Sequence, residues 1–108
     1  MATTYKVLGQ LASTTSAVSI YTCPSATQTI VSSIVIANRE AAENTFRIIL
    51  RPNNEGLADK HYIAYDTPIT ANNVIALTLG ITMDATDQLY VLGSDTNLTF
   101  QVFGSEIA

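Results

Sequence analysis

Two long β-patterned runs joined by a short polar corner constrain the fold of this chain more than any other feature. The first run, Gln28–Asn38, is dense in β-branched residues. The second run, Thr45–Pro52, alternates its side chains and places Phe46, Ile48 and Leu50 on one side. A half-buried strand requires a side-chain period of two, and branched side chains pack well on a pleated surface. The two runs therefore predict neighbouring strands of a sheet.

The rest of the chain repeats this pattern, with turn signals between the runs. The eight strand candidates are Tyr5–Leu11, Val18–Cys23, Gln28–Asn38, Thr45–Pro52, Lys60–Thr67, Val74–Met83, Gln88–Ser94 and Leu98–Glu106. Gly80 interrupts the sixth run and predicts a bend or bulge there. Strands at this spacing without helices between them predict an all-β protein. We expect one domain over residues 1–108, a single β-sandwich of about eight mostly antiparallel strands with Greek-key or jelly-roll connections.

The run Gln28–Asn38 also bears on assembly, because it is apolar on both faces. Under strict alternation the two apolar sets are Ile30, Ile34 and Ile36 against Val31, Val35 and Ala37. Such a strand is either central and covered within its own protein or covered by a partner chain, whereas an isolated antiparallel sandwich leaves one face of each sheet in water. We therefore expect a homo-oligomer, and a trimer before a dimer.

The composition favours contact with protein and argues against nucleic acid. Charged residues are 13% of the 108, the net charge is −4, and Ser and Thr together make up about a fifth. Such a neutral, hydroxyl-rich surface suits burial against another protein, because few charges would lose their water. A bland β-sandwich without such a partner is the alternative. Arg47 and Arg51 share a strand face, but two arginines in an acidic chain do not form a phosphate-binding footprint. We expect no nucleic-acid partner.

Reactive side chains are few, and we expect no enzymatic activity. His61 is the only histidine, and we interpret it as an exposed or edge-strand residue despite the nearby Asp59 and Asp66. Cys23 is the only cysteine, so neither an internal disulfide nor a Cys-based zinc site is possible, and it is interpreted as a small apolar core residue. The nine carboxylates are scattered through loops as turn formers. The sequence therefore predicts no catalytic, cofactor-binding or metal-binding residues.

The N-terminal sequence and the aromatic residues further limit the classes of protein to which this chain could belong. The start, Met1–Lys6, lacks the apolar region of a secretory signal, and no apolar run approaches the roughly 18 residues of a membrane span. We expect synthesis in a cytosol-like compartment and no membrane partner. Five tyrosines would suit either an interface or a carbohydrate cleft, but tryptophan, the residue on which sugars stack most readily, is absent. A carbohydrate-binding or receptor-contact module is therefore a distant alternative.

Five segments together resemble a known family. They are Thr4–Gln10, Tyr21–Thr27, Asp59–Asp66, Leu77–Asp87 and Phe103–Ile107. With them, nearly the whole chain is similar to small virion proteins of tailed bacteriophages, especially those that infect cyanobacteria and other marine bacteria.

The resemblance implies a β-rich structural protein that is made in the host cytoplasm, is located in the virion and has no enzymatic activity. Its first implication is a capsid decoration (cement) protein that binds the major capsid protein, or another virion protein, in the assembled shell. A tail, neck or baseplate component is the second. The resemblance assigns no functional residues. From expected exposure alone, Met1–Val7 and the Asn53–Lys60 loop are the candidate shell contacts.

Overall fold

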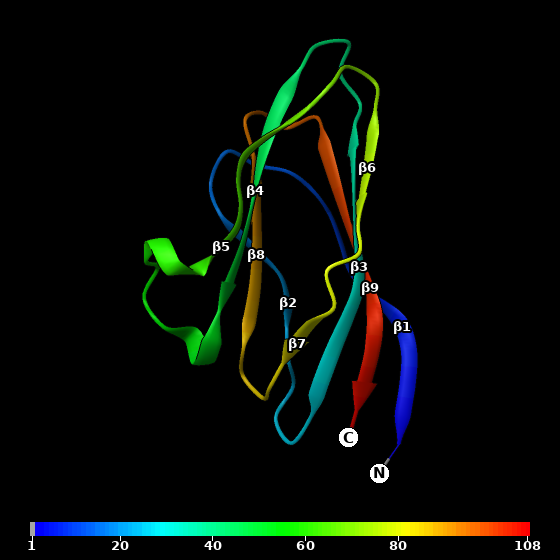
Figure 1. Cartoon of the computed structure of the whole chain (residues 1–108), viewed down its shortest axis with the longest axis vertical. Helices are drawn as coiled ribbons and strands as arrows, with labels where there is room; N and C mark the ends of the chain where they lie inside the picture. The colour runs from blue at the N-terminus through cyan, green and yellow to red at the C-terminus, as the bar shows by residue number, and fades with distance from the viewer. Residues whose placement is uncertain (1) are drawn as a thin grey trace.

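Two antiparallel sheets face one another across an apolar core (Figure 1). The computed structural model describes residues 2–108. Sheet A contains, in spatial order, β1 (Thr3–Ala12), β9 (Leu98–Ile107) and β3 (Gln28–Asn38), followed by β6 (Val74–Leu77) and β7 (Ile81–Met83), which both pair with β3. Sheet B contains β2 (Val18–Thr22), β8 (Gln88–Gly93), β4 (Asn44–Arg51) and β5 (Tyr62–Ile69) in that order. Two short 3-10 helices, η1 (Pro52–Asn54) and η2 (Asp59–His61), lie between β4 and β5.

The strand pairing is nested, as in a long hairpin rolled up on itself. The first strand pairs with the last, β2 with β8, β3 with β6 and β7, and β4 with β5. This order is that of a jelly roll, so the topology is the second of the two connections expected from the sequence. Because β1 and β9 are neighbours, the first and last described residues lie side by side, and Ala2 and Ala108 exchange two backbone hydrogen bonds of 2.8 and 2.9 Å (Figure 1).

The strand predictions are confirmed, with a few corrections. Val74–Met83 is not one strand but two, so residues 2–108 contain nine strands; the break lies at Gly80, whose positive φ of 61° makes the predicted bend. Lys60 and His61 belong to η2, not to β5. Pro68 lies inside β5, where it is tolerated because β5 is an edge strand paired only with β4. Neither of the two short helices is long and apolar enough to span a membrane.

The core lies between the sheets and is filled from both. Phe100 of sheet A meets Phe46 of sheet B edge to face, with ring centroids 6.2 Å apart. Cys23 lies in this core, as predicted, and its thiol is 3.2 Å from Thr29 Oγ1. The remaining buried core residues are Ile20, Tyr21, Val31, Ile34, Ile36, Ile48, Ile69, Ile81, Met83, Leu89, Val91, Leu98 and Val102.

A bulge in β3 corrects the two apolar sets expected from strict alternation. The pairing of β3 with β9 shifts between Val31 and Ser33. The extra residue reverses the alternation, so Val31 joins Ile34 and Ile36 in the core. Ile30, on the opposite side, remains exposed. The strand is therefore covered by its own protein on one face and half open on the other.

A polar tie connects the two sheets at the end where the termini lie. The Tyr21 hydroxyl of β2 donates to Glu106 of β9 and also lies 2.7 Å from Thr29 Oγ1 of β3. Lys6 Nζ of β1 lies 2.9 Å from the other Glu106 oxygen. The hydrogen bond from Tyr21, followed by that from Lys6, lowers the pKa of Glu106, while burial and the carboxylate raise the pKa of Tyr21. The ionised form of Glu106 therefore stabilises the folded state.

This tie should make the protein acid-sensitive. A carboxyl whose pKa is lowered by folding stabilises the protein above its unfolded pKa of about 4.3, and this stabilisation is lost as the pH falls through the folded value. We expect Glu106→Gln to lower the melting temperature at neutral pH and to lose that deficit below about pH 4. Thermal melts across the acid range test this, with Glu43→Gln in an exposed loop as the control. A deficit that stays constant with pH would contradict it.

Candidate interaction surfaces

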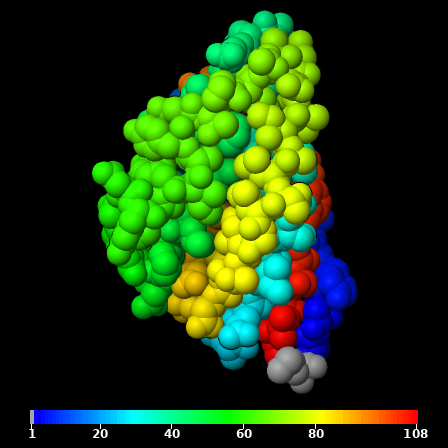
Figure 2. Space-filling model, in the orientation of Figure 1, coloured from blue at the N-terminus to red at the C-terminus, as the bar shows by residue number. Residues whose placement is uncertain are grey.

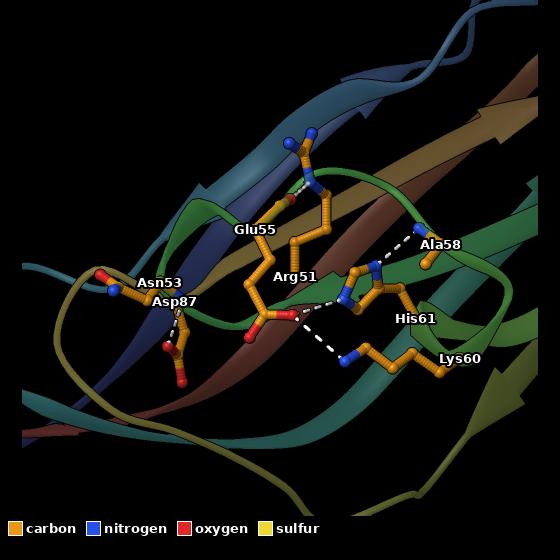
Figure 3. A network of polar contacts seen from close by, with 7 residues as sticks. All are labelled: Arg51, Asn53, Glu55, Ala58, Lys60, His61 and Asp87. Atoms are coloured by element: carbon orange, nitrogen blue, oxygen red, sulfur yellow. Dashed lines mark hydrogen bonds and ion pairs between the residues drawn. The ribbon is translucent and has the colours of Figure 1, made fainter.

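His61 is buried in η2, which corrects the expectation of an exposed or edge-strand histidine, and its contacts close a loop (Figure 3). The backbone N–H of Ala58 donates to His61 Nδ1 at 3.0 Å, so the proton of the neutral ring lies on Nε2. That nitrogen lies 3.2 Å from Glu55 Oε1, which Lys60 Nζ also approaches at 3.5 Å. The contacts to His61 and Lys60 lower the pKa of Glu55.

This arrangement is structural. Both ring nitrogens of His61 are occupied by groups of its own loop, and within residues 2–108 no hydroxyl or thiol hydrogen-bonds to the ring. The partner is Glu55, six residues upstream, and not Asp59 or Asp66, the two aspartates closest to it in sequence. Arg51 Nε donates to the Glu55 carbonyl at 2.7 Å and anchors the same loop to β4 (Figure 3).

Aspartate side chains in the loops accept hydrogen bonds from backbone N–H groups. Asp87 accepts from the backbone N–H groups of Asn53 and Asp84, each at 2.9 Å, and so joins two loops. In the described part of the chain, no group of three or more His, Cys, Asp or Glu side chains is placed to hold a metal ion. These observations fit turn formation.

The outer face of sheet A, which points away from sheet B, is the most distinctive surface. Opposed residues of neighbouring strands share a face, and faces alternate along each strand. Because Ile34, Ile36, Phe100 and Val102 are fully buried, the residues between them point outward. The outward residues are Thr3, Tyr5, Val7, Gln10 and Ala12 of β1, Thr99, Gln101, Phe103, Ser105 and Ile107 of β9, Gln28, Ile30, Ser33, Val35 and Ala37 of β3, Val74 and Ala76 of β6, and Thr82 of β7. We call this set the neutral face.

The neutral face carries no charge in the described chain. The five strands of sheet A contain only two charged residues, Lys6 and Glu106, and both point inward and pair with each other. Several apolar side chains are open to water instead: Tyr5 is 84% exposed, Val74 58%, Val7 49% and Ile30 39%. A broad apolar surface without charges is typical of a protein-protein interface, since its burial removes no charge from water.

The outer face of sheet B differs in character. Arg47 forms a two-pronged ion pair with Asp66, at 2.7 and 3.2 Å, and its guanidinium lies 3.9 Å from the centre of the Tyr65 ring. Arg51 stacks on Tyr90 at 4.8 Å. The ion pair with Arg47 lowers the pKa of Asp66. The two arginines do share a strand face, as expected, but both are engaged within the protein.

The two segments singled out as shell contacts lie on different sheets. Within the first, Met1 lies outside the described residues, and Thr3–Val7 form the exposed start of β1 in sheet A. The Asn53–Lys60 loop lies at the β4–β5 side of sheet B, on the opposite flank of the molecule (Figure 1). A single flat partner surface would contact one or the other.

The neutral face was not predicted as a site. Its sequence signal was present, because β3 and β9 together contain a single charged residue, Glu106. The sequence did not reveal that these uncharged strands form one surface, because their spatial order was unknown. In the sheet β1, β9 and β3 are neighbours although they come from distant parts of the chain.

Comparisons with known proteins give a likeness of fold. No protein-family model matches the chain, and no curated protein matches it in sequence. Among solved structures, a chain in the structure of infectious bursal disease virus, Gx strain, is similar with a TM-score of 0.53 at 14% sequence identity. The match covers 97% of this chain but 31% of the viral one. The present protein therefore corresponds to less than a third of that chain.

Proposed function

We propose that this protein is a non-enzymatic structural component of a virion and that it decorates the assembled capsid shell. The neutral face is the observation that carries this proposal, because it provides a broad surface whose burial desolvates no charge. Jelly rolls recur in viral capsid domains, and the likeness to a chain of a virus structure is consistent with that use. The whole-chain resemblance to small phage virion proteins points the same way.

A decoration protein gains affinity because a capsid shell repeats the same binding site many times. A shell offers many equivalent sites, and an oligomer that contacts several capsid subunits at once gains affinity through effective concentration. A protein that binds the assembled shell and not its free subunits stabilises assembly by mass action. Neither effect requires a reactive side chain. The homo-oligomer expected from the sequence remains a prediction within this proposal.

Copy number and location test the proposal. We expect quantitative mass spectrometry of purified virions to give this chain a copy number close to that of the major capsid protein, and a cryo-electron-microscopy map to show it on the shell. Tens of copies or fewer, with density confined to the tail, neck or baseplate, would contradict decoration and support the second structural role. Affinity for glycans without any density in the virion would favour the carbohydrate-binding alternative.

A further inference from the structure

The outer edge of β1 is open along Thr3–Val7. Sheet A ends at this strand, which pairs with β9 on one side and with no other strand of the described chain. The strand forms the margin of the molecule beside β9 (Figure 2). Long open edges pair readily with other strands, and proteins usually protect them with prolines, outward charges or covering segments. Thr3–Val7 contains no proline, and its one charge, Lys6, is paired with Glu106.

The direction of the backbone groups along this edge is fixed by the ladder with β9. Ala2 exchanges both of its backbone hydrogen bonds with Ala108 and therefore points toward β9. In an antiparallel ladder this direction alternates from residue to residue, so Thr4 and Lys6 also point toward β9. The N–H and C=O groups of Thr3, Tyr5 and Val7 consequently point to the open side. Three residues thus present unpaired donors and acceptors in a regular row.

We propose that two copies of this chain pair through these edges, antiparallel and about a twofold axis at Tyr5, to form one continuous sheet across the dimer. In this register Tyr5 lies opposite Tyr5 of the second copy, and Thr3 lies opposite Val7. All three residues are those whose backbone groups face the open side, so every pair in the row is a hydrogen-bonded pair. The inference goes beyond the proposed function and does not depend on it.

Charge and symmetry argue for a second copy as the occupant. The register puts Lys6 opposite Thr4 of the partner, so no like charges meet, and the outward pairs Tyr5–Tyr5 and Thr3–Val7 are neutral. A twofold axis needs one self-complementary surface, which this edge supplies, whereas a ring of three needs two different surfaces that fit each other. Pairing also joins two neutral faces into one uncharged surface of twice the area.

Cysteine crosslinking tests the register directly. At a hydrogen-bonded antiparallel pair the Cα atoms are about 5.5 Å apart, which lies within the range of a disulfide. We expect Tyr5→Cys to form a covalent dimer under mild oxidation. Val7→Cys, equally near the edge, should not, because its symmetry mate lies about 13 Å along the strand. Thr3→Cys mixed with Val7→Cys should crosslink, although neither does so alone. The wild-type chain is the negative control, because its cysteine, Cys23, is buried and should not crosslink.

A proline on the open side provides the second measurement. Tyr5→Pro removes an N–H that bonds nothing within the protein, so the β1–β9 ladder is kept while the dimer ladder is broken. We expect analytical ultracentrifugation to give twice 11.6 kDa for the wild type and 11.6 kDa for Tyr5→Pro, with unchanged far-UV circular dichroism. A wild-type monomer or trimer, a Tyr5→Pro dimer, or stronger crosslinking at Val7→Cys than at Tyr5→Cys would overturn the proposal. Because all these readings are made without a shell, they are independent of shell binding.

Discussion

Gly104→Ala is expected to lower the free energy of unfolding by at least about 4 kcal/mol, a large part of the 5–15 kcal/mol typical of a domain. Gly104 lies on β9 opposite Val31, beside the β3 bulge. A methyl group there would lie far inside the contact distance of the Ile30 carbonyl oxygen and 3.0 Å from Leu8 Cδ1. Overpacking usually costs about 1–3 kcal/mol because side chains can move aside. Here the obstacle is backbone in a paired strand, so relief requires breaking the β3–β9 ladder.

Gly56→Ala is the matched control. An added Cβ at Gly56 meets no atom within 4 Å, and the residue lies in the exposed loop between η1 and η2. We expect this variant to unfold at the wild-type urea concentration or slightly above it, since alanine restricts the unfolded chain. Urea titrations followed by far-UV circular dichroism compare the two. Equal midpoints for Gly104→Ala and Gly56→Ala would show that β9 accommodates the methyl group.

The strands were predictable because their signal is local. Alternation and β-branching placed Gln28–Asn38 at its observed bounds and the outer ends of the other predicted runs within about two residues of the observed ones. Gly80 marked the break between β6 and β7 for an equally local reason, since its left-handed backbone favours glycine. Lys60 and His61 were assigned to the strand because a single 3-10 turn leaves no periodic pattern to recognise.

The faces of β3 were not predictable, because the bulge depends on the partner strand. Strict alternation along Val31-Ser32-Ser33-Ile34 would place Val31 and Ile34 on opposite faces of the strand. Because β3 has one extra residue opposite β9, both side chains instead point into the core. A one-residue shift moves a whole apolar set from one face to the other. The burial of His61 was not predictable either, because it depends on contacts within a loop, such as that with Glu55, and a loop produces no periodic pattern in the sequence.

The low charge of the chain did indicate a surface suited to burial, and the structure gives that indication a location. The charged residues lie in loops, on the outer face of sheet B, or in the inward pair Lys6–Glu106. The outer face of sheet A contains only side chains that are apolar or carry a hydroxyl or amide group. Composition alone could state how many charges there are, but only the strand order shows which face lacks them.

A charge placed on the neutral face should strongly weaken the proposed binding to the shell without unfolding the protein. Ile30 is 39% exposed on this face, and Ile63 of β5 in sheet B is 38% exposed, so the two isoleucines match in type and exposure. If the neutral face is buried against the shell, Ile30→Glu introduces an unpaired charge into the interface. Such a charge costs about 3–5 kcal/mol, so we expect affinity to fall at least about 100-fold. Ile63→Glu should bind as the wild type does.

The sign of the charge separates burial from electrostatic attraction. Burial removes an added charge of either sign from water, so Ile30→Lys should also weaken binding, although less than Ile30→Glu, because Asp84 and Asp87 line the same surface hollow as Ile30 and can pair with the ammonium. A charged shell surface would instead tolerate one of the two and reject the other. Cosedimentation with shells that lack this protein measures all three variants, and thermal melts verify that each is folded. If only one sign weakened binding, or if Ile63→Glu weakened it equally, shell contact through the uncharged face of sheet A would be wrong.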